Sequence, residues 1–384
     1  MAYGKRNVIQ VDPLRYSLCL LSPSKLGKTT LMYQYCTKLA GPTGSLFIET
    51  GSERGADAIA GINYINAPEW HMDEYDSFNN AMGFAEICDD IIENKSTEYP
   101  DLRCVVIDSI DHWIEIAEKE SLRLYNKEAR KKGKETASSL NEAWGGWGRA
   151  EKKALELMLD YRDKLLNVGV QVMYIGHIKR REITDAITQQ TYSVISSDQQ
   201  QNYFNALKKD LHFLAVMYMD REIIEKSTGK KTPTGKDIKE GKVESETRKI
   251  KFRDDSYVID SGSRFSNIVP EIECDVDQFI KAITDAIDAE AKKGGQDIEA
   301  SKAEQAAALA KRTKEIAEAE AKHKQQKELD TIISSLKDWI QSNKPNPDKV
   351  KALIAKSKDL GIANPLDVAS LEDAKTLLAY TESL

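Results

Sequence analysis

Residues 22–30 read Ser-Pro-Ser-Lys-Leu-Gly-Lys-Thr-Thr, a pattern suited to holding phosphate groups. Gly27 lets the backbone come close to a β-phosphate, and inward-pointing loop amides form a nest for an anion. We expect Lys28 to bridge the β- and γ-phosphates and the Thr29 hydroxyl to hold Mg²⁺. The residues predicted to bind the nucleotide in this loop are Ser22, Pro23, Ser24, Lys25, Leu26, Gly27, Lys28, Thr29 and Thr30.

The neighbours of this loop support the same interpretation. A short apolar run precedes it at 16–21 and a helix-like segment follows at 31–40, which gives the strand, loop and helix of a phosphate-binding motif. This context disfavours the alternative, a chance Gly-Lys-Thr on an ordinary helix cap. The loop usually opens with glycine, whereas Ser22 occupies that place here, and the cost of the serine depends on its backbone dihedral. The pattern predicts that the chain binds ATP with Mg²⁺.

A buried strand ending in an acid is the usual partner of such a loop. Residues 103–108 read Arg-Cys-Val-Val-Ile-Asp, so we expect Asp108 to orient a water on Mg²⁺ at the carboxyl end of a sheet. A candidate strand at 62–65 falls between the two motifs. It fits the subclass of these enzymes that inserts a strand and uses a glutamate to activate water.

That glutamate should follow the strand predicted at 45–49. Glu49 stands at the strand tip, and Glu53 stands in a glycine-flanked turn just beyond it. We prefer Glu53 as the general base because a turn can aim its carboxylate at the γ-phosphate. The alternative is that one or both glutamates only solvate a loop.

His177 ends the apolar run that begins at Val172. An imidazole at a strand end can hydrogen-bond a γ-phosphate and report hydrolysis to the following loop. A purely structural histidine is the alternative. We therefore carry Lys28, Glu53 and His177 forward as the candidate catalytic residues.

Apolar runs alternate with helical patterns over the first 220 residues or so, which predicts an α/β fold with a mostly parallel sheet covered by helices on both faces. A basic stretch at 227–242 is interpreted as an exposed loop between two strands. The expected strands are 17–21, 45–49, 62–65, 103–108, 170–175, 212–219 and 247–253, and the expected helices include 77–94, 149–167 and 276–289.

Three regions follow from composition. Residues 1–289 form the core, and 290–327, rich in Ala, Glu, Lys and Gln, form a charged helical linker. Residues 328–384 carry three apolar helix faces, the last with a capping box at Ser370 and Asp373. A small three-helix bundle without chemistry of its own is suited to contact with a protein or a nucleic acid.

Composition limits the kinds of partner and compartment. The chain has 384 residues, 30% of them charged, and a net charge of −7, so nucleic-acid binding must be local. Its five cysteines form no C-x-x-C pair, which indicates reduced thiols. No stretch approaches the roughly 20 apolar residues that span a membrane. We expect a soluble, cytoplasmic protein.

Taken together, the motifs resemble those of phage-encoded RecA-like ATPases, in particular the group associated with phage single-strand annealing and recombination proteins. The resemblance covers roughly residues 5–285 and includes Trp147-Gly148 before a long helix. It implies a RecA-like core, Lys28 and Thr29 on nucleotide and metal, Asp108 on the metal, Glu53 as base and His177 as sensor. It also places the protein in the cytoplasm of the phage's host cell.

Two segments combine cations with aromatic rings, as single-strand binders do. One lies at 127–149 and the other follows His177, and both are expected to leave the carboxyl end of the sheet, where RecA-like proteins place their DNA loops. Solvated lysines and packing tryptophans are the alternative. The predicted DNA-binding residues are Lys131, Lys132, Trp147, Arg149, Lys179, Arg180, Arg181, Tyr192, Lys208 and Lys209.

The leading hypothesis is an ATPase that binds single-stranded DNA and promotes annealing or recombination. We also expect a homo-oligomer. By analogy with relatives, Arg248, Lys249 and Lys251 could reach a neighbour's γ-phosphate, and the alternative is that they form the solvated face of a strand. The rival is a nucleotide-gated assembly or adaptor whose C-terminal module recruits a protein partner. A small-molecule kinase is disfavoured because no arginine-rich lid pattern stands out.

Overall fold

The computed structural model describes residues 7–51, 54–184, 189–231, 237–254 and 258–384, with the side chains of 223–231 and 237–242 left out. Its strands are β1 (Leu18–Ser22), β2 (Ser45–Glu49), β3 (Tyr64–Asn66), β4 (Cys104–Asp108), β5 (Gln171–Thr184), β6 (Thr191–Ser197), β7 (Phe213–Lys231), β8 (Asp237–Lys251), β9 (Gly262–Ser263) and β10 (Glu271–Glu273). Its α-helices are α1 (Lys28–Ala40), α2 (Phe84–Glu93), α3 (Ile110–Lys131), α4 (Arg149–Asn167), α5 (Gln201–Lys208), α6 (Val276–Lys293), α7 (Ile298–Ser342), α8 (Pro347–Asp359) and α9 (Leu371–Glu382).

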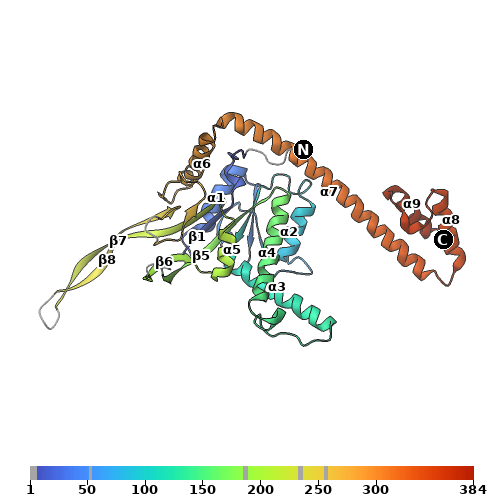
Figure 1. The fold of residues 1–384 in the computed structure, drawn as a ribbon, viewed down its shortest axis with the longest axis horizontal. Helices are drawn as coiled ribbons and strands as arrows, with labels where there is room; N and C mark the ends of the chain where they lie inside the picture. Colours follow the sequence, from blue (N-terminus) through green and yellow to red (C-terminus); the bar gives the residue numbers. More distant parts are fainter. Residues whose placement is uncertain (1–6, 52–53, 185–188, 232–236, 255–257) are drawn as a thin grey trace. The chain divides into compact units, whose positions relative to one another are not determined.

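The strands form a mixed sheet in the order β10-β8-β7-β1-β5-β4-β2-β3, with β6 paired to β5 and β9 to β7 (Figure 1). The run from β7 through β3 is parallel throughout. Antiparallel pairing is found at β7–β8, β8–β10, β7–β9 and β5–β6. The predicted α/β fold with a mostly parallel sheet is confirmed.

Both faces of the central part of the sheet are buried, which explains why β1, β2 and β4 are apolar over most of their length. In β1, Cys19 and Leu21 face one core, which the helices α2 to α5 cover. Leu18 and Leu20 face the other core, which α1 and α6 cover. The central strands are therefore held from two sides, and their carboxyl ends meet at one edge.

The strand predicted at 62–65 exists as β3 but lies at the edge of the sheet, beside β2. The strand that separates β1 from β4 is β5, the one that carries His177. The prediction that residues 62–65 form the inserted strand is therefore wrong, because the order of the strands in the sheet differs from their order in the chain.

Two segments predicted as loops are strands. The stretch 227–242, expected as a basic loop, is largely taken up by the β7–β8 hairpin, whose register continues through Ser227↔Lys239 to Lys231↔Asp237. Likewise β5 does not stop near Ile175 but runs to Thr184 and pairs with β6. In both hairpins the cross-strand backbone hydrogen bonds satisfy strands whose side chains are mostly polar, and polarity had favoured the loop interpretation.

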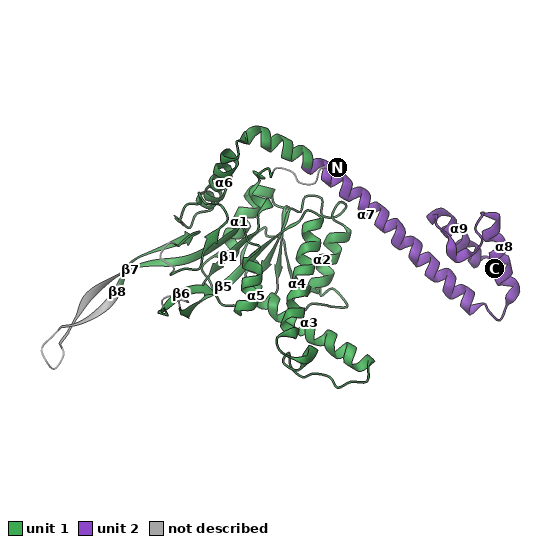
Figure 2. Ribbon diagram, in the orientation of Figure 1, with its two compact units in different colours: residues 1–308 green, residues 309–384 purple. Residues whose placement is uncertain are grey.

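The chain divides into two compact units, residues 1–308 and 309–384 (Figure 2). Helix α7 runs unbroken from Ile298 to Ser342, through the end of unit 1, the segment expected as a linker and the first helix of the C-terminal module. Unit 2 has its own apolar core around Leu336, Leu353 and Leu377. Ser370 caps α9 by accepting a hydrogen bond from the N–H of Asp373.

All five cysteines are free thiols, four of them buried. Among the described helices, none combines the length and the apolar character that crossing a membrane requires.

The core of unit 2 makes a prediction about its stability. Leu336 is fully buried, so Leu336→Ala should lower the free energy of unfolding of unit 2 by about 2–5 kcal/mol and leave the unfolding of unit 1 unchanged. Calorimetry on the full chain measures both transitions. Leu309→Ala, at a 38% exposed position of the same helix, is the matched control. An equal loss in the two variants would contradict this description of the core.

Candidate functional site

The loop after β1 has the backbone shape of an anion nest. Lys25 and Gly27 adopt left-handed φ angles of 61° and 99°, and such alternation turns successive N–H groups toward one point. Helix α1 begins at Lys28, so the N–H groups of its first turn, including those of Thr29 and Thr30, are not used inside the helix. Pro23 and Ser24 are exposed and Leu26 is half-buried. The loop can hold an anion with backbone groups alone.

Ser22, in place of the usual glycine, creates no backbone strain. It is the last residue of β1 and pairs with His177 in extended, parallel register, a conformation open to any residue. Its side chain is buried, and its Oγ donates to the carbonyl of Pro23 at 2.8 Å. Left-handed backbone, which favours glycine, is required at Gly27 instead.

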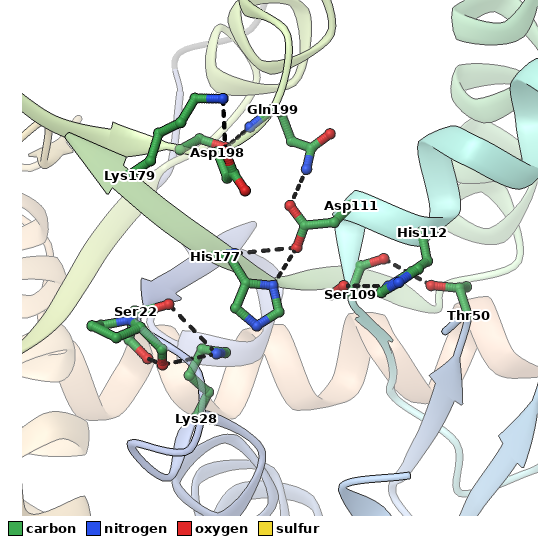
Figure 3. A network of polar contacts seen from close by, with 12 residues as sticks. Ser22, Lys28, Thr50, Ser109, Asp111, His112, His177, Lys179, Asp198 and Gln199 are labelled. Carbon is green, nitrogen blue, oxygen red and sulfur yellow. Dashed lines mark hydrogen bonds and ion pairs between the residues drawn. The ribbon is translucent and has the colours of Figure 1, made fainter. Parts of the chain in front are cut away.

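Lys28 is held inside the loop. Its side chain is only 6% exposed, and its ammonium donates to the carbonyl oxygens of Pro23 at 3.1 Å and Ser22 at 3.5 Å. A buried ammonium is costly unless polar groups surround it. The loop therefore already positions one positive charge where an incoming anion would meet it (Figure 3).

Thr29 and Asp108 join the loop to β4. The Thr29 hydroxyl donates to Oδ2 of Asp108 at 2.6 Å. Asp108 ends β4, and its carbonyl accepts the N–H of Thr50 at 2.9 Å. A hydroxyl and a carboxylate at this spacing are oxygen ligands of the kind Mg²⁺ prefers.

Glu49 lies beside this pair, in register with Asp108 on the neighbouring strand. Its side chain is buried, and its Oε1 accepts the N–H of Ala56 at 2.7 Å. In the described part of the chain, its buried Oε2 meets no hydrogen-bond donor. Glu53, the preferred base in the sequence analysis, lies outside the described residues.

A small cavity opens at Glu49. Its volume is about 20 Å³, enough for one water molecule. Burial raises the pKa of Glu49, and the nearby carboxylate of Asp108 adds to the effect although the Ala56 N–H opposes it. A carboxylate whose pKa is raised and which faces a water-sized cavity is equipped to accept a proton. The cavity is lined by Thr29, Glu49, Gly51, Arg54, Gly55, Asp108, Ser109 and His112.

His177 is fixed by an aspartate that the sequence analysis did not single out. Its Nδ1 lies 2.7 Å from Oδ2 of Asp111, which also accepts the backbone N–H of His177 at 3.2 Å. The Gln199 side chain donates to the other oxygen of Asp111 (Figure 3). Burial opposes ionisation of Asp111, but the hydrogen bonds from His177 and Gln199 outweigh it and hold its pKa below the usual range. The available signal was an acid in the first turn of the helix after Asp108.

The first cation-rich segment occupies the end of α3 and the loop beyond it. Lys131 ends the helix, and Lys132 pairs with Glu128 at 3.4 Å. Trp147 is 97% exposed. Arg149 opens α4 and donates to the carbonyl of Trp144 at 3.4 Å.

The second segment is a hairpin rather than a loop, and three of its cations contact their own chain. Lys179 pairs with Asp198 at 2.7 Å, Arg181 donates to the Ser197 carbonyl at 3.0 Å, and Lys208 pairs with Asp260. Arg180, Tyr192 and Lys209 are exposed. The nearby aromatic rings of Tyr203 and Phe204 are buried in the core, so they cannot stack on a base.

The cations predicted to reach a neighbouring subunit also have partners within the chain. Lys249 pairs with Asp220 at 2.8 Å and with Glu271 at 3.2 Å. Lys251 pairs with Asp254. Arg248 donates to the carbonyl of Leu26 at 3.3 Å, in the loop of its own chain.

A comparison with known families gives a match over more than half of the chain. The family described as "AAA domain" matches residues 14–249, from before β1 into β8. This range contains the loop, Asp108, Glu49 and His177. No curated protein matches the chain.

The raised pKa of Glu49 predicts how stability depends on pH. Because the fold disfavours the ionised carboxylate, Glu49→Gln should unfold at a higher temperature than the wild type at about pH 8. The gain should shrink as the pH falls through the raised pKa and vanish below the usual value of about 4.3. Thermal unfolding across this pH range measures it.

Asp111→Asn is the control, because the pKa of Asp111 is shifted in the opposite direction to that of Glu49. The lowered pKa of Asp111 stabilises the fold above the usual aspartate value, and this contribution is lost as the pH falls through the lowered pKa. The variant should therefore be less stable than the wild type near neutral pH. A Glu49→Gln variant that is destabilised at every pH would contradict the assignment.

Proposed function

Because the chain belongs to the AAA domain family and is a nucleotide-binding P-loop ATPase, we propose that it hydrolyses ATP with Mg²⁺. We propose further that it binds single-stranded DNA and supports annealing or recombination. One observation carries the hydrolytic part of the proposal. The side chains of Thr29, Asp108 and Glu49 surround one water-sized cavity next to the phosphate loop.

Each group has a role that follows from its position. The amides of the nest and Lys28 bind the phosphates, and Thr29 and Asp108 hold the metal. Mg²⁺ supplies charge neutralisation of the phosphate oxygens when it is bound. Glu49 orients a water and accepts its proton, because it lines the cavity and its Oε2 meets no donor in the described part of the chain. Glu53 stays a candidate for the same role.

His177 is proposed as the sensor of the bound phosphate. It pairs with Ser22 of the loop strand, its Nδ1 is engaged by Asp111, and its ring lies beside Ser22 and Lys28 (Figure 3). Asp111 begins α3 and also holds Gln199, which lies just before α5. A shift of His177 would thus be transmitted through Asp111 to α3 and through Gln199 to α5, both outside the nucleotide site.

The DNA part of the proposal is supported by the sequence resemblance to phage recombination ATPases and by exposed cations and an exposed aromatic ring on the core. Lys131 and Arg180 are exposed cations, and Trp147 is an exposed indole. Cations neutralise phosphates, and aromatic rings stack on bases without regard to sequence.

A second candidate function is a nucleotide-gated assembly or adaptor, with a homo-oligomer as its working form. The observation that favours it is unit 2, which has an apolar core of its own and exposed polar faces. In this case the C-terminal module would recruit a protein partner.

Glu49→Gln and Glu53→Gln test the identity of the base. If Glu49 accepts the proton, Glu49→Gln should lower the rate of ATP hydrolysis by about 10²- to 10⁴-fold, and Glu53→Gln should retain most of it. Fluorescent ATP analogues should bind both variants as they bind the wild type. Full activity in Glu49→Gln together with its loss in Glu53→Gln would reverse the assignment.

ATP hydrolysis with and without an oligodeoxythymidylate separates the two candidate functions. DNA dependence should appear as stimulation that falls steeply with salt, because phosphate contacts release counterions. Absence of DNA binding at about 50 mM salt would contradict the proposed DNA function. Nucleotide-dependent oligomerisation without any effect of DNA would favour the adaptor.

A further inference from the structure

Helix α3 carries a groove outside the nucleotide site. The groove has a volume of about 630 Å³ and is open to solvent. Its lining residues recur every three or four positions, so they form one face of a single helix. We call it the α3 groove, and it is lined by Lys119, Leu122, Arg123, Asn126, Lys127, Arg130 and Lys131.

The charge of the α3 groove is positive and largely uncompensated. Arg123 is held by the buried carboxylate of Glu120 at 2.6 Å. For the other four cations, the described part of the chain provides no ion pair. Two other acids of the helix are engaged elsewhere, because Glu118 accepts the hydroxyl of Tyr203 and Glu128 pairs with Lys132. The exposed Glu115 lies one turn before Lys119, at the start of the row. The four cations concerned are Lys119, Lys127, Arg130 and Lys131.

This pattern differs from that of the hairpin β5–β6. There, Lys179 and Arg181 contact a carboxylate and backbone carbonyls of their own chain. In a chain with a net charge of −7, a face with four such cations marks a place for an anionic partner.

The loop after α3 is fastened to the helix and presents an indole. Trp144 donates to the carbonyl of Ser121 at 3.1 Å and packs edge-on against Tyr125. Asn126 exchanges two hydrogen bonds with the backbone of Ala137, at 2.8 and 3.0 Å. Trp147, three residues beyond Trp144, is left 97% exposed. The cations and the loop that carries Trp147 therefore belong to one substructure, whose helix extends beyond α2 and α4 (Figure 1).

We propose that the α3 groove binds the sugar–phosphate backbone of single-stranded nucleic acid, with Trp147 as a stacking platform for a base. The proposal rests on the proposed function and deepens it by assigning the binding surface. The row from Lys119 to Arg130 extends about 16 Å along the helix, which matches a linear chain of phosphates better than a compact anion. The exposed indole favours a nucleic acid over an acidic peptide, because bases stack on aromatic rings.

The groove also has a direct connection to the nucleotide site. Helix α3 begins two residues after Asp108, and Asp111 in its first turn contacts His177. From Asp111 to Lys119 the helix rises by about 12 Å. A strand bound in the groove thus contacts the same rigid helix that orients the proposed phosphate sensor.

The salt dependence of binding tests the assignment. Binding of a fluorescein-labelled oligodeoxythymidylate to the full chain is measured by anisotropy between about 50 and 200 mM salt. In the double variant Lys127→Gln/Arg130→Gln, the slope of log K against log salt should become less negative by about 1.4, because each lost phosphate contact on a single strand contributes about 0.7. Trp147→Ala should weaken binding roughly 5- to 150-fold with little change in slope.

The matched control is Lys281→Gln/Lys302→Gln, which removes the same charge from exposed positions of unit 1 and should keep the wild-type slope. Binding of a fluorescent ATP analogue checks that every variant is folded. Equal slopes for the groove and control variants, with wild-type DNA binding intact, would overturn the groove and leave the DNA function standing. A wild type that binds no DNA would overturn both. Tight binding of polyglutamate in place of DNA would assign the groove to an acidic protein instead.

Discussion

The hydrogen bond from Thr29 to Asp108 is the contact on which the rest of the site depends. It joins the first turn of α1 to the end of β4 at 2.6 Å, although β5 lies between β1 and β4 in the sheet. The contact can form only because the central strands are parallel and end at the same edge, where α/β folds place their ligands. Apolar cores on both faces of the sheet hold that edge in place.

The same edge holds charges in surroundings that disfavour them. Lys28 and Glu49 are both buried, and backbone groups contact each of them. Burial raises the pKa of Glu49, and this is the cost to stability that comes with a usable base. Asp111 behaves in the opposite way, because His177 and Gln199 stabilise its charge. Two carboxyl groups of one site are thus adapted for different tasks by their neighbours.

Much of this could be predicted from local sequence. Residues 45–49 and 149–167 form β2 and α4 within the expected bounds, because apolar runs and helical periodicity are local signals. The backbone conformation of Ser22 could not be predicted, because it is fixed by pairing with His177, 155 positions further along the chain. The continuation of β5 into a hairpin was missed for a related reason, because polar strands resemble loops in sequence. The contact of Asp111 with His177 and the cavity beside Glu49 both form between elements that are distant in the chain. Local sequence therefore carries only weak signals for them.

The most direct test is the Mg²⁺ dependence of nucleotide affinity in the wild type and in Asp108→Asn. Binding of a fluorescent ATP analogue is titrated with Mg²⁺ and again with a chelator. If Thr29 and Asp108 hold the metal at this edge, Mg²⁺ should tighten binding to the wild type, and the variant should lose that gain while retaining metal-free binding through the loop. An equal gain from Mg²⁺ in both proteins would contradict the account.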